Sequence, residues 1–430
     1  MIITKKKKSF LRKQWEILFL EIIKKRISKK TLENKQVLII DDPIILEDLL
    51  IKRSVDQNVK LVIISIPLNN FENLVEFFYK INSIFPDETK IVVNYYSILW
   101  TPIFYFFSKI GLINSLKKNE CLFSKRILEI FLQSTNYRIS HYINEPLIPF
   151  NIFGLTKCLN IVTNVFTFLN FFSFTKICYL QKRNISENFM KKKASIIIPC
   201  KNEENNIQKL FEDTNKLEFP YELVFIDDQS NDTTLEKINH QINLNTNKEV
   251  KVINGNGLGK YQAVKLGIKE ASGYYSMIFD ADITVDMTDL NLFYKAIAEG
   301  RGNLINGSRL IYKPYAGAMK TLNYYGNIFF AILVSYITNS KVSDTLCGTK
   351  CFKTSDIEKF DEFENKNKIL DLWGDFNILF ASAFYGLKTI DLPIRYKKRE
   401  EGETKMNKRF FFFKNMLRTC SKAFIRFKIL

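Results

Sequence analysis

The sequence predicts an α/β protein in which a doubly wound, Rossmann-like domain follows a smaller α/β domain. Three observations lead to this prediction. The chain has 430 residues, which suggests two or three domains. Short apolar runs alternate with segments of helical spacing, which is typical of α/β proteins. A polar, charged stretch at residues 181–193 interrupts the alternation and predicts a linker between two domains.

The first alternating region, residues 36–180, predicts the smaller domain. Apolar runs at Gln36–Asp41, Lys60–Ile66 and Lys90–Tyr95 are typical of buried parallel strands, and helical spacing marks Asn70–Phe85. The preceding residues, 1–35, are basic and aromatic. They fit either an arm on a membrane surface or a solvated tail.

The second alternating region, residues 194–405, predicts the doubly wound sheet. We expect strands at Ser195–Pro199, Glu222–Ile226, Lys251–Ile253, Tyr275–Phe279 and Asn303–Ile305, and helices at Asn205–Leu217, Thr233–Asn243, Lys260–Ala271 and Asp289–Glu299. Ligands of such sheets bind beyond the carboxyl ends of the strands. Four aspartates follow strand ends: Asp227, Asp228, Asp280 and Asp282. The sequence therefore predicts a ligand site at that edge.

The net charge of +18 indicates an anionic partner, which would be a nucleic acid, an anionic lipid or a phosphorylated substrate. Solvated surface lysines, as encoded by an AT-rich genome, would produce the same excess. A nucleic-acid-binding protein remains a remote alternative. The sequence contains no recognised DNA or RNA motif, so we expect no nucleic-acid partner.

Cysteine and histidine usage limits the chemistry. The seven cysteines form no CxxC pair and no secretory signal is evident, which predicts reduced thiols and a cytoplasmic location. With two histidines in the chain, Ser–His–Asp and Cys–His catalysis and His-rich metal sites are improbable. Since no apolar run reaches the roughly 20 residues of a spanning helix, we expect none. The groups that remain for catalysis are carboxylates, Lys/Arg side chains and an oxygen-ligated metal.

The segment YSMIFDADITVD places Asp280 and Asp282 directly after an apolar strand. Two carboxylates this close repel each other, and a divalent cation relieves the repulsion. Mg²⁺ typically binds one or two protein carboxylates and completes its shell with water and substrate phosphates. A D-x-D pair alone also occurs in surface turns. Its position at a strand end favours a metal site.

Seven segments carry a resemblance to a known family. They occur in the order SIIIPCKNEENNI, VFIDDQSNDTT, GKYQAVKLGI, MIFDADITVD, NGSRL, DTLCGTKCF and RYKKREEGETKM. Together they resemble family 2 glycosyltransferases of the GT-A fold, near the dolichol-phosphate mannosyltransferase branch. The resemblance covers about residues 194–405 and implies a mixed, doubly wound sheet.

The resemblance implies a nucleotide-sugar site. It assigns Asp280 and Asp282 to Mg²⁺ or Mn²⁺ on the donor diphosphate, with Asp282 also in a catalytic role. The nucleotide-sugar contacts that it implies are Pro199, Asn202, Glu203, Asp227, Asp228, Lys260, Asp280 and Arg309. Three of these residues have an alternative interpretation. The acids at 227–228 would also suit a helix N-cap, for which Asp232 competes, and Lys260 would suit a surface turn after glycines.

The resemblance also implies an acceptor side. Asp375 is the expected catalytic base, although many relatives carry a second acid where this chain has Asn377. A phosphate acceptor would make a base less necessary. The expected acceptor and phosphate loop contains Lys350, Arg399 and Lys405. Without the family context, the stretch around 395–406 would be a solvated charge run.

Residues 406–430 mix aromatic and basic side chains and predict a helix. Cations beside aromatics suit a helix in a lipid interface, and anionic lipids would add attraction. Packing of this helix on the catalytic domain is the alternative. The sequence therefore predicts an anionic membrane surface as a partner and a peripheral location at the inner face of the membrane.

The N-terminal region resembles the C-terminal half of class I methyltransferase domains, through KIVVNYYSILWTPIFYFFSKIGL at 90–112 and NEPLIPF at 144–150. Such domains place a glycine-rich loop after their first strand. Here VLII is followed by Asp41-Asp42-Pro43, and without glycine the backbone cannot approach the cofactor closely. We therefore predict a degenerate domain that binds no S-adenosylmethionine and serves a structural or docking role.

The predicted function is metal-dependent, inverting transfer of a sugar from a nucleoside-diphosphate sugar to a polyprenyl phosphate. The alternative is a glycosyltransferase that acts on a glycan acceptor in cell-surface polysaccharide assembly. The two differ in whether activity depends on lipid.

Overall fold

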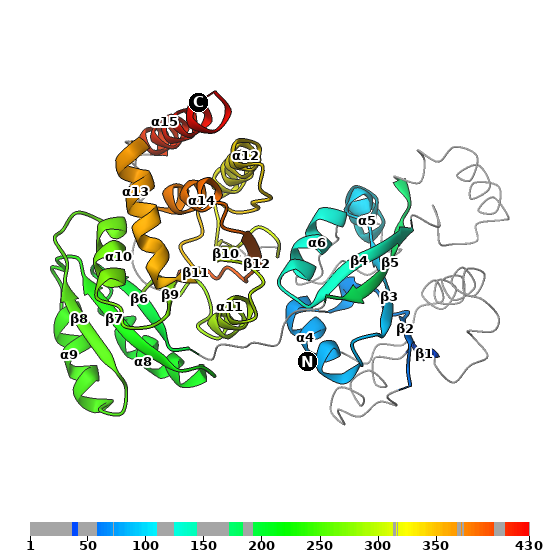
Figure 1. The fold of residues 1–430 in the computed structure, drawn as a ribbon, viewed down its shortest axis with the longest axis horizontal. Helices are drawn as coiled ribbons and strands as arrows, with labels where there is room; N and C mark the ends of the chain where they lie inside the picture. Colours follow the sequence, from blue (N-terminus) through cyan, green and yellow to red (C-terminus); the bar gives the residue numbers. More distant parts are fainter. Residues whose placement is uncertain are drawn as a thin grey trace. The chain divides into compact units, whose positions relative to one another are not determined.

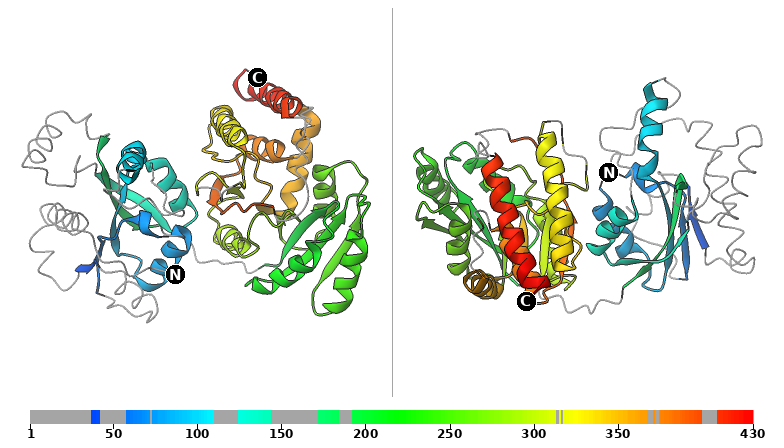
Figure 2. Two further views of the ribbon diagram at one scale, coloured as in Figure 1. Left: turned by 180° about the vertical axis from the view of Figure 1, so that it is seen from behind. Right: turned by 90° about the horizontal axis from the view of Figure 1, so that it is seen from above.

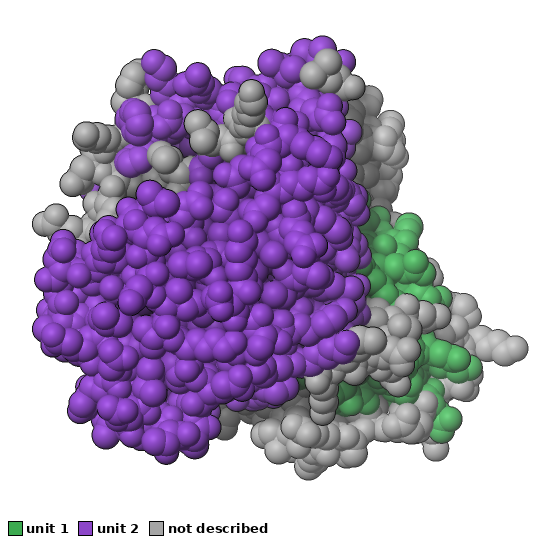
Figure 3. Space-filling view, turned by 60° about the vertical axis from the view of Figure 1, so that its left-hand side comes forward, with its two compact units in different colours: residues 1–185 green, residues 186–430 purple. Residues whose placement is uncertain are grey.

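The computed structural model describes residues 37–41, 58–71, 73–109, 124–143, 172–183, 192–312, 315, 317–367, 371, 374–399 and 409–429. The chain divides into two compact units, Met1–Ile185 and Ser186–Leu430 (Figure 3). The division falls within the linker expected at 181–193. The predicted basic arm at 1–35 lies outside the described residues.

Unit 1 contains a five-stranded sheet in the order β1-β2-β3-β5-β4 (Figure 1). Its strands are β1 (Val37–Ile40), β2 (Leu61–Ile64), β3 (Lys90–Tyr96), β4 (Tyr137–Ile143) and β5 (Thr175–Lys182). Strands β1, β2 and β3 are parallel, as predicted, and β5 runs antiparallel between β3 and β4. Strand β5 continues two residues into the predicted linker.

Among the described residues of unit 1, the α-helices are α4 (Leu74–Ile84), α5 (Thr101–Lys109) and α6 (Lys125–Gln133). Helix α4 begins where Asn73 accepts a hydrogen bond from the Glu76 backbone N–H at 3.1 Å. It buries Phe77 and Phe78 completely. The short 3₁₀ turns Leu68–Asn70 and Ile98–Trp100 follow β2 and β3.

Unit 2 contains a mixed seven-stranded sheet in the order β12-β10-β11-β9-β6-β7-β8, which agrees with the predicted class (Figure 1). Its strands are β6 (Ala194–Cys200), β7 (Tyr221–Asp227), β8 (Val250–Asn254), β9 (Tyr275–Ile278), β10 (Leu304–Ser308), β11 (Lys350–Lys353) and β12 (Thr389–Pro393). Strand β11 is antiparallel to β9 and β10, and the other pairs are parallel. The carboxyl ends of β7, β6 and β9 therefore meet at one edge.

Helices cover both faces of this sheet. They are α8 (Ile207–Asp213), α9 (Thr234–Leu244), α10 (Lys260–Lys269), α11 (Asp289–Ala298), α12 (Thr321–Thr338), α13 (Ile357–Asn367), α14 (Asp375–Phe384) and α15 (Arg409–Lys428). Alternate residues of β6 feed the two cores. Ile196 and Ile198 pack with α8, α9 and α11, whereas Ile197 packs with α10 and α12–α15. This alternation is what a strand buried on both faces requires.

The C-terminal helix α15 packs against α12, α13 and α14. Figure 2 shows α15 in red beside α12 in yellow. Met416, Cys420 and Ala423 are buried on the inner side of α15, so the packing alternative considered for this helix is correct for that side. Within the described ranges, no helix is long and apolar enough to cross a membrane.

Candidate active site

The site lies at the carboxyl ends of the parallel strands, as the sequence predicts. Strand β6 pairs with β7 through Cys200 and Asp227, and with β9 through Ile197 and Ile278. The carboxyl ends of these strands, with the loops that follow them, contain positions 199–203, 227–228 and 280–282. Because neighbouring parallel strands end at one edge, residues that are 80 apart in sequence become neighbours.

The acidic pair faces two cations from other parts of the chain. The Lys260 Nζ lies 2.6 Å from Asp280 Oδ1. Arg399 donates a hydrogen bond to the Asp282 carboxylate. Burial alone would raise the pKa of Asp280, but the surrounding cations, led by Lys260, lower it. Asp280 is therefore an anion at neutral pH.

A glycine-rich turn positions Lys260 as the first residue of α10. Gly257 and Gly259 both have left-handed backbones, with φ of +68° and +95°, a conformation that glycine adopts without strain. Burial disfavours the charged ammonium, and the carboxylates of Asp280 and Asp375 outweigh this and raise the pKa of Lys260. Lys260 thus follows a glycine turn, as the alternative interpretation has it, and its ammonium is also paired with Asp280.

Gly348 leaves room beside the acidic pair. A Cβ at this position would lie 2.5 Å from Asp280 Oδ2 and 2.5 Å from Lys260 Nζ. Both separations are shorter than a carbon can approach, so a side chain here would displace one of the two groups. The space next to the carboxylates therefore depends on glycine.

These residues fit a divalent, oxygen-ligated cation. Asp280 and Asp282 offer carboxylate oxygens on one turn, and about a third of the Asp280 side chain is exposed. Among the described residues, no group of three or more His, Cys, Asp or Glu side chains is arranged to hold a metal. A metal at this pair would take its other ligands from water and a substrate, as Mg²⁺ usually does.

The acids on the next strand form the neighbouring part of the site. Asp228 is buried, accepts a hydrogen bond from the Gly259 backbone N–H at 3.2 Å and lies 3.9 Å from Lys201 Nζ. Thr233 is the N-cap residue of α9, and the Asp232 carboxylate beside it accepts from the Thr234 backbone N–H at 3.0 Å. Asp227 accepts from the Ser230 backbone N–H at 3.3 Å. Asp228 is thus bonded to the glycine turn at the start of α10 and not to the start of α9.

The loop after β6 is held by hydrogen bonds to the loop after β7. Asn202 has a left-handed backbone with φ of +56°, and its Oδ1 accepts from the Asn231 N–H at 2.8 Å. The Glu203 N–H donates to Thr234 Oγ1 at 2.9 Å, and its carboxylate accepts from Asn206 at 2.8 Å. Pro199 lies within β6. The structure brings these predicted residues to the same edge as Asp228.

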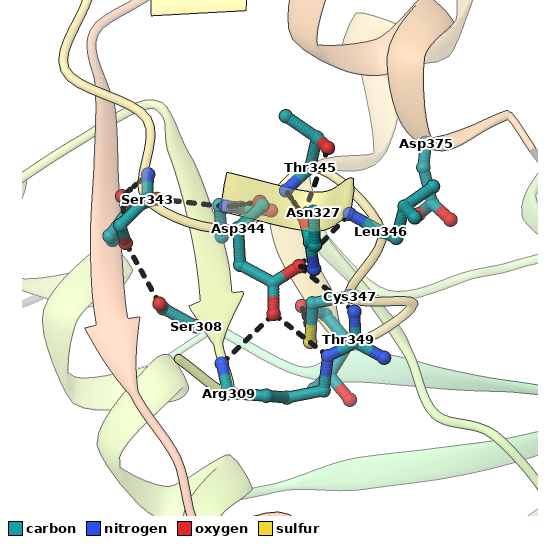
Figure 4. Close-up of polar contacts among 12 residues, drawn as sticks. Ser308, Arg309, Asn327, Ser343, Asp344, Thr345, Leu346, Cys347, Thr349 and Asp375 are labelled. Carbon is teal, nitrogen blue, oxygen red and sulfur yellow. Dashed lines mark hydrogen bonds and ion pairs between the residues drawn. The ribbon is translucent and has the colours of Figure 1, made fainter. Parts of the chain in front are cut away.

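Arg309 is bound in a bidentate ion pair that the sequence analysis missed (Figure 4). Its Nε and its second terminal nitrogen donate to Asp344 at 2.8 and 2.9 Å. Asn327 of α12 also donates to this carboxylate at 2.6 Å. Burial would raise the pKa of Asp344, but Arg309 and these donors lower it to about 2. The sequence indicated Asp344 only through its place in DTLCGTKCF, one of the segments that carry the family resemblance.

Lys350 and Asp375 form a second buried pair. Lys350 Nζ lies 2.6 Å from Asp375 Oδ1 and also donates to the Cys347 carbonyl. The Lys350 side chain has no exposed surface. Asp375 is the first residue of α14, after Gly374 with φ of +80°. The predicted base and the predicted phosphate contact therefore bind each other.

Asn377, which stands where many relatives carry a second acid, lies inside the protein. Its Nδ2 donates to the Tyr261 hydroxyl at 2.5 Å. The side chain therefore joins α14 to α10. Lys405, predicted for the acceptor loop, lies outside the described residues.

Part of unit 2 matches a known protein family. Residues 195–387 match the family described as Glycosyl transferase family 2. The matched segment lies within unit 2 and accounts for somewhat less than half of the chain.

Individual relatives carry the comparison further. The chain is 29% identical over 228 residues to the dolichol-phosphate mannosyltransferase of Pyrococcus furiosus, covering 51% of this chain and 61% of the relative. It is 23% identical over 217 residues to the undecaprenyl-phosphate 4-deoxy-4-formamido-L-arabinose transferase of Proteus mirabilis, covering 50% and 62%. The chain thus spans about three fifths of the length of these relatives.

A similar solved structure is a mannosyltransferase from Pyrobaculum calidifontis, determined with GDP-Man and Mn²⁺. It is 15% identical, covers 55% of this chain and 64% of its own, and has a TM-score of 0.40. The family match at residues 195–387 lies within unit 2.

Proposed function

We propose that the protein is a metal-dependent, inverting glycosyltransferase. It moves a sugar from a nucleoside-diphosphate sugar to a polyprenyl phosphate. The relatives named above act on undecaprenyl or dolichol phosphate, as their names state. The acceptor class therefore comes from sequence similarity, and the residues of unit 2 supply the chemistry.

One observation carries the proposal. Asp280 and Asp282 follow the carboxyl end of β9. Asp280 is paired with Lys260, the first residue of α10, and Asp282 is paired with Arg399 from a distant part of the chain. A diphosphate with its metal also contains negative and positive charges, the phosphates being negative and the metal positive. The carboxylates would hold Mg²⁺ or Mn²⁺, and the two cations would contact the phosphates. The metal would neutralise charge on the departing nucleoside diphosphate.

The donor nucleoside would lie against the loops that follow β6 and β7. Asp228 and Glu203 offer carboxylate oxygens that can accept hydrogen bonds from ribose hydroxyls or a base. Asn202 joins the two loops through its bond to Asn231 and would keep them in register. Asp227 and Pro199 belong to the strands that position these loops.

The acceptor side favours a phosphate over a sugar hydroxyl. In inverting transfer, an acceptor oxygen attacks the anomeric carbon while the bond from that carbon to the diphosphate oxygen breaks. A hydroxyl acceptor needs a base to take its proton. Asp375 is already engaged by Lys350 at 2.6 Å. A phosphate monoester arrives as an anion and needs no base, so Asp375 would order the site together with Lys350.

A polyprenyl-phosphate acceptor implies work at a membrane. We propose a peripheral location at the inner, cytoplasmic face of the membrane, with an anionic lipid surface as a partner. Arg399 and Lys405 belong to the expected loop over the phosphates, and Arg309 would support it through its pair with Asp344.

For unit 1 we propose a degenerate methyltransferase-like domain with a structural or docking role. The sheet with three parallel strands and an antiparallel strand suits an α/β domain of this kind. Strand β1 ends at Ile40 and is followed by Asp41 rather than by glycine. Calorimetry with S-adenosylmethionine should give no binding heat, and measurable binding would contradict the proposal.

The decisive experiment measures nucleoside diphosphate release. Purified protein with Mn²⁺ is incubated with a panel of UDP- and GDP-sugars, with and without undecaprenyl phosphate. Release that requires the lipid is the expected result and names the donor. Release that requires a glycan instead would establish the alternative acceptor class. No release with any combination, together with no nucleotide binding by calorimetry, would contradict the proposed function.

A further inference from the structure

Helix α12 presents an unbroken apolar stripe to solvent. Leu322, Tyr325, Phe329, Ile332 and Tyr336 are 69%, 64%, 47%, 59% and 62% exposed. Their spacing of three and four residues places them on one face of the helix. Scattered exposed apolar side chains are normal, but a continuous patch of large ones marks an interaction surface.

The outer face of α15 continues this stripe. Phe413 lies with its ring centroid 6.2 Å from that of Phe329, and Phe424 stacks on Tyr336 at 6.5 Å. The right-hand view of Figure 2 shows the two helices side by side. Beyond this seam, Phe411, Ile425 and Ile429 of the α15 segment are 54%, 47% and 67% exposed. The two helices thus share one apolar surface.

The charges on this surface have one sign. Exposed cations on α15 alternate with the apolar side chains: Lys414, Arg418, Arg426 and Lys428. Lys428 also lies over the Tyr336 ring at 5.2 Å. The sequence has no Asp or Glu between residues 310 and 343 or between 406 and 430. A protein partner of ordinary composition would not require this pattern, whereas anionic headgroups above an apolar layer match it.

The inner face of α12 reaches the candidate active site. Asn327 is buried and donates to the Asp344 carboxylate at 2.6 Å, and its Oδ1 accepts from the Thr345 N–H at 3.1 Å. Asp344 in turn holds Arg309. One helix therefore carries the apolar stripe on one side and contacts the phosphate-site residues on the other.

We propose that the α12–α15 surface is the face with which the protein docks on an anionic lipid bilayer, α12 contributing the apolar anchor and α15 the cations. This inference rests on the proposed function, because docking here would bring a membrane-embedded phosphate close to the site. It differs from an anchor made of the C-terminal helix alone, since α12 carries most of the exposed apolar side chains.

The test is vesicle co-sedimentation of the full chain. The double variant Leu322→Gln/Ile332→Gln removes two of the most exposed apolar side chains, and Leu244→Gln, at 65% exposure on α9, is the control. On phosphatidylcholine vesicles that contain phosphatidylglycerol, we expect the double variant to bind at least roughly tenfold more weakly. The control should bind like the unmodified protein. Equal binding of both variants would overturn the proposal.

A second variant tests the cations separately. Lys414→Gln/Arg418→Gln should weaken binding to the anionic vesicles by roughly fivefold for each charge removed. Binding to pure phosphatidylcholine should change little. If the unmodified protein binds no vesicles and light scattering shows a dimer that the Leu322→Gln/Ile332→Gln change dissociates, the surface is an interface between copies and the proposal is wrong.

Transfer to a short, water-soluble prenyl phosphate without vesicles separates this inference from the proposed function. The α12 double variant should retain unmodified activity in that assay while losing vesicle binding. Absence of transfer in every variant would count against the proposed function and leave the vesicle result to decide the docking surface.

Discussion

Each unit contains a mixed sheet, and the polar residues in or just after its parallel strands have different kinds of partner in the two units. In unit 1, Asn94 of β3 donates to the carbonyls of Ile64 and Ser65 at 3.2 and 3.0 Å, and the Ser65 N–H donates to Ile40. These groups satisfy the backbone of neighbouring strands. In unit 2, Asp280 and Asp282 at the end of β9 instead face side-chain cations. A polar residue near a strand end therefore indicates a ligand site only where a ligand can take the place of its present partner.

Neutralising one carboxylate tests this contrast with the largest expected effect. We expect Asp282→Asn to lower sugar transfer by at least roughly 10³-fold, because metal binding at the diphosphate supplies several kcal/mol. The matched change in unit 1 is Asp41→Asn, after β1, and should leave transfer unchanged. Nucleoside diphosphate release measures both. Full activity of Asp282→Asn in a folded protein would refute its metal role.

Buried lysines in the two units should differ in their effect on stability. Lys350→Met leaves Asp375 charged and buried, and we expect a loss of about 3–5 kcal/mol in the free energy of unfolding. Lys182 of unit 1 is equally buried, but its partner Asp87 is 84% exposed, and it also donates to the Asn82 and Phe85 carbonyls.

Lys182→Met should therefore cost less, about 1–3 kcal/mol, which corresponds to lost hydrogen bonds. Adding Asp375→Asn to Lys350→Met should recover part of the loss. Urea unfolding measures all of these variants. A larger loss for Lys182→Met than for Lys350→Met would show that partner burial does not control the effect.

The pH dependence of stability should report the Arg309–Asp344 pair. The pKa of Asp344 is lowered from 3.8 to about 2 in the folded state. The stabilisation from this pair is therefore present at pH values above the pKa of Asp344 in the unfolded state. It is lost as pH falls through the pKa of Asp344 in the folded state.

Between pH 6 and pH 3 the unmodified protein should lose about 1 kcal/mol more unfolding free energy than Asp344→Asn. In unit 1, Asp87→Asn serves as the control, because Asp87 is largely exposed. Urea unfolding at several pH values gives the comparison. Equal slopes for the unmodified protein and Asp344→Asn would argue against the pair as the cause.

The smallest expected effect concerns metal binding without nucleotide. Lys260 competes with a metal for Asp280, and because this pair is partly exposed it contributes about 0.5–1 kcal/mol. Lys260→Met should therefore tighten Mn²⁺ binding by roughly two- to fivefold. Lys251→Met, which removes a cation near Glu222 instead, is the charge-matched control. Calorimetry with Mn²⁺ alone measures it, and unchanged affinity would contradict the competition.

Much of unit 2 could be predicted because its strands are buried on both faces. The expected strands from Ser195 to Phe279 lie within one or two residues of β6–β9, and their ends located the acidic pair. Strands β11 and β12 and helices α12–α14 were not predicted. Strand β11 has four residues and follows a loop, and α12 is apolar on nearly all sides, so neither shows a clear period.

The partners of the charged residues could not be predicted either. The sequence identified Arg309, Lys350 and Asp375 but gave no distance between them. Asp344 pairs with Arg309, and Lys350 pairs with Asp375. Both pairs depend on the antiparallel placement of β11 beside β10, which is set by long-range packing. For the same reason, the exposed face of α12 was visible only in the structure.

The pairing of charges in the site has an electrostatic consequence. The four carboxylates Asp280, Asp282, Asp344 and Asp375 are matched one to one by Lys260, Arg399, Arg309 and Lys350. This group of eight side chains is electroneutral, although the chain carries +18. A divalent cation and a diphosphate with two negative charges leave the net charge of the site at zero when they bind together. Either one alone would give the site a net charge. Donor and metal should therefore bind cooperatively, with an ionic-strength dependence far weaker than the total charge implies.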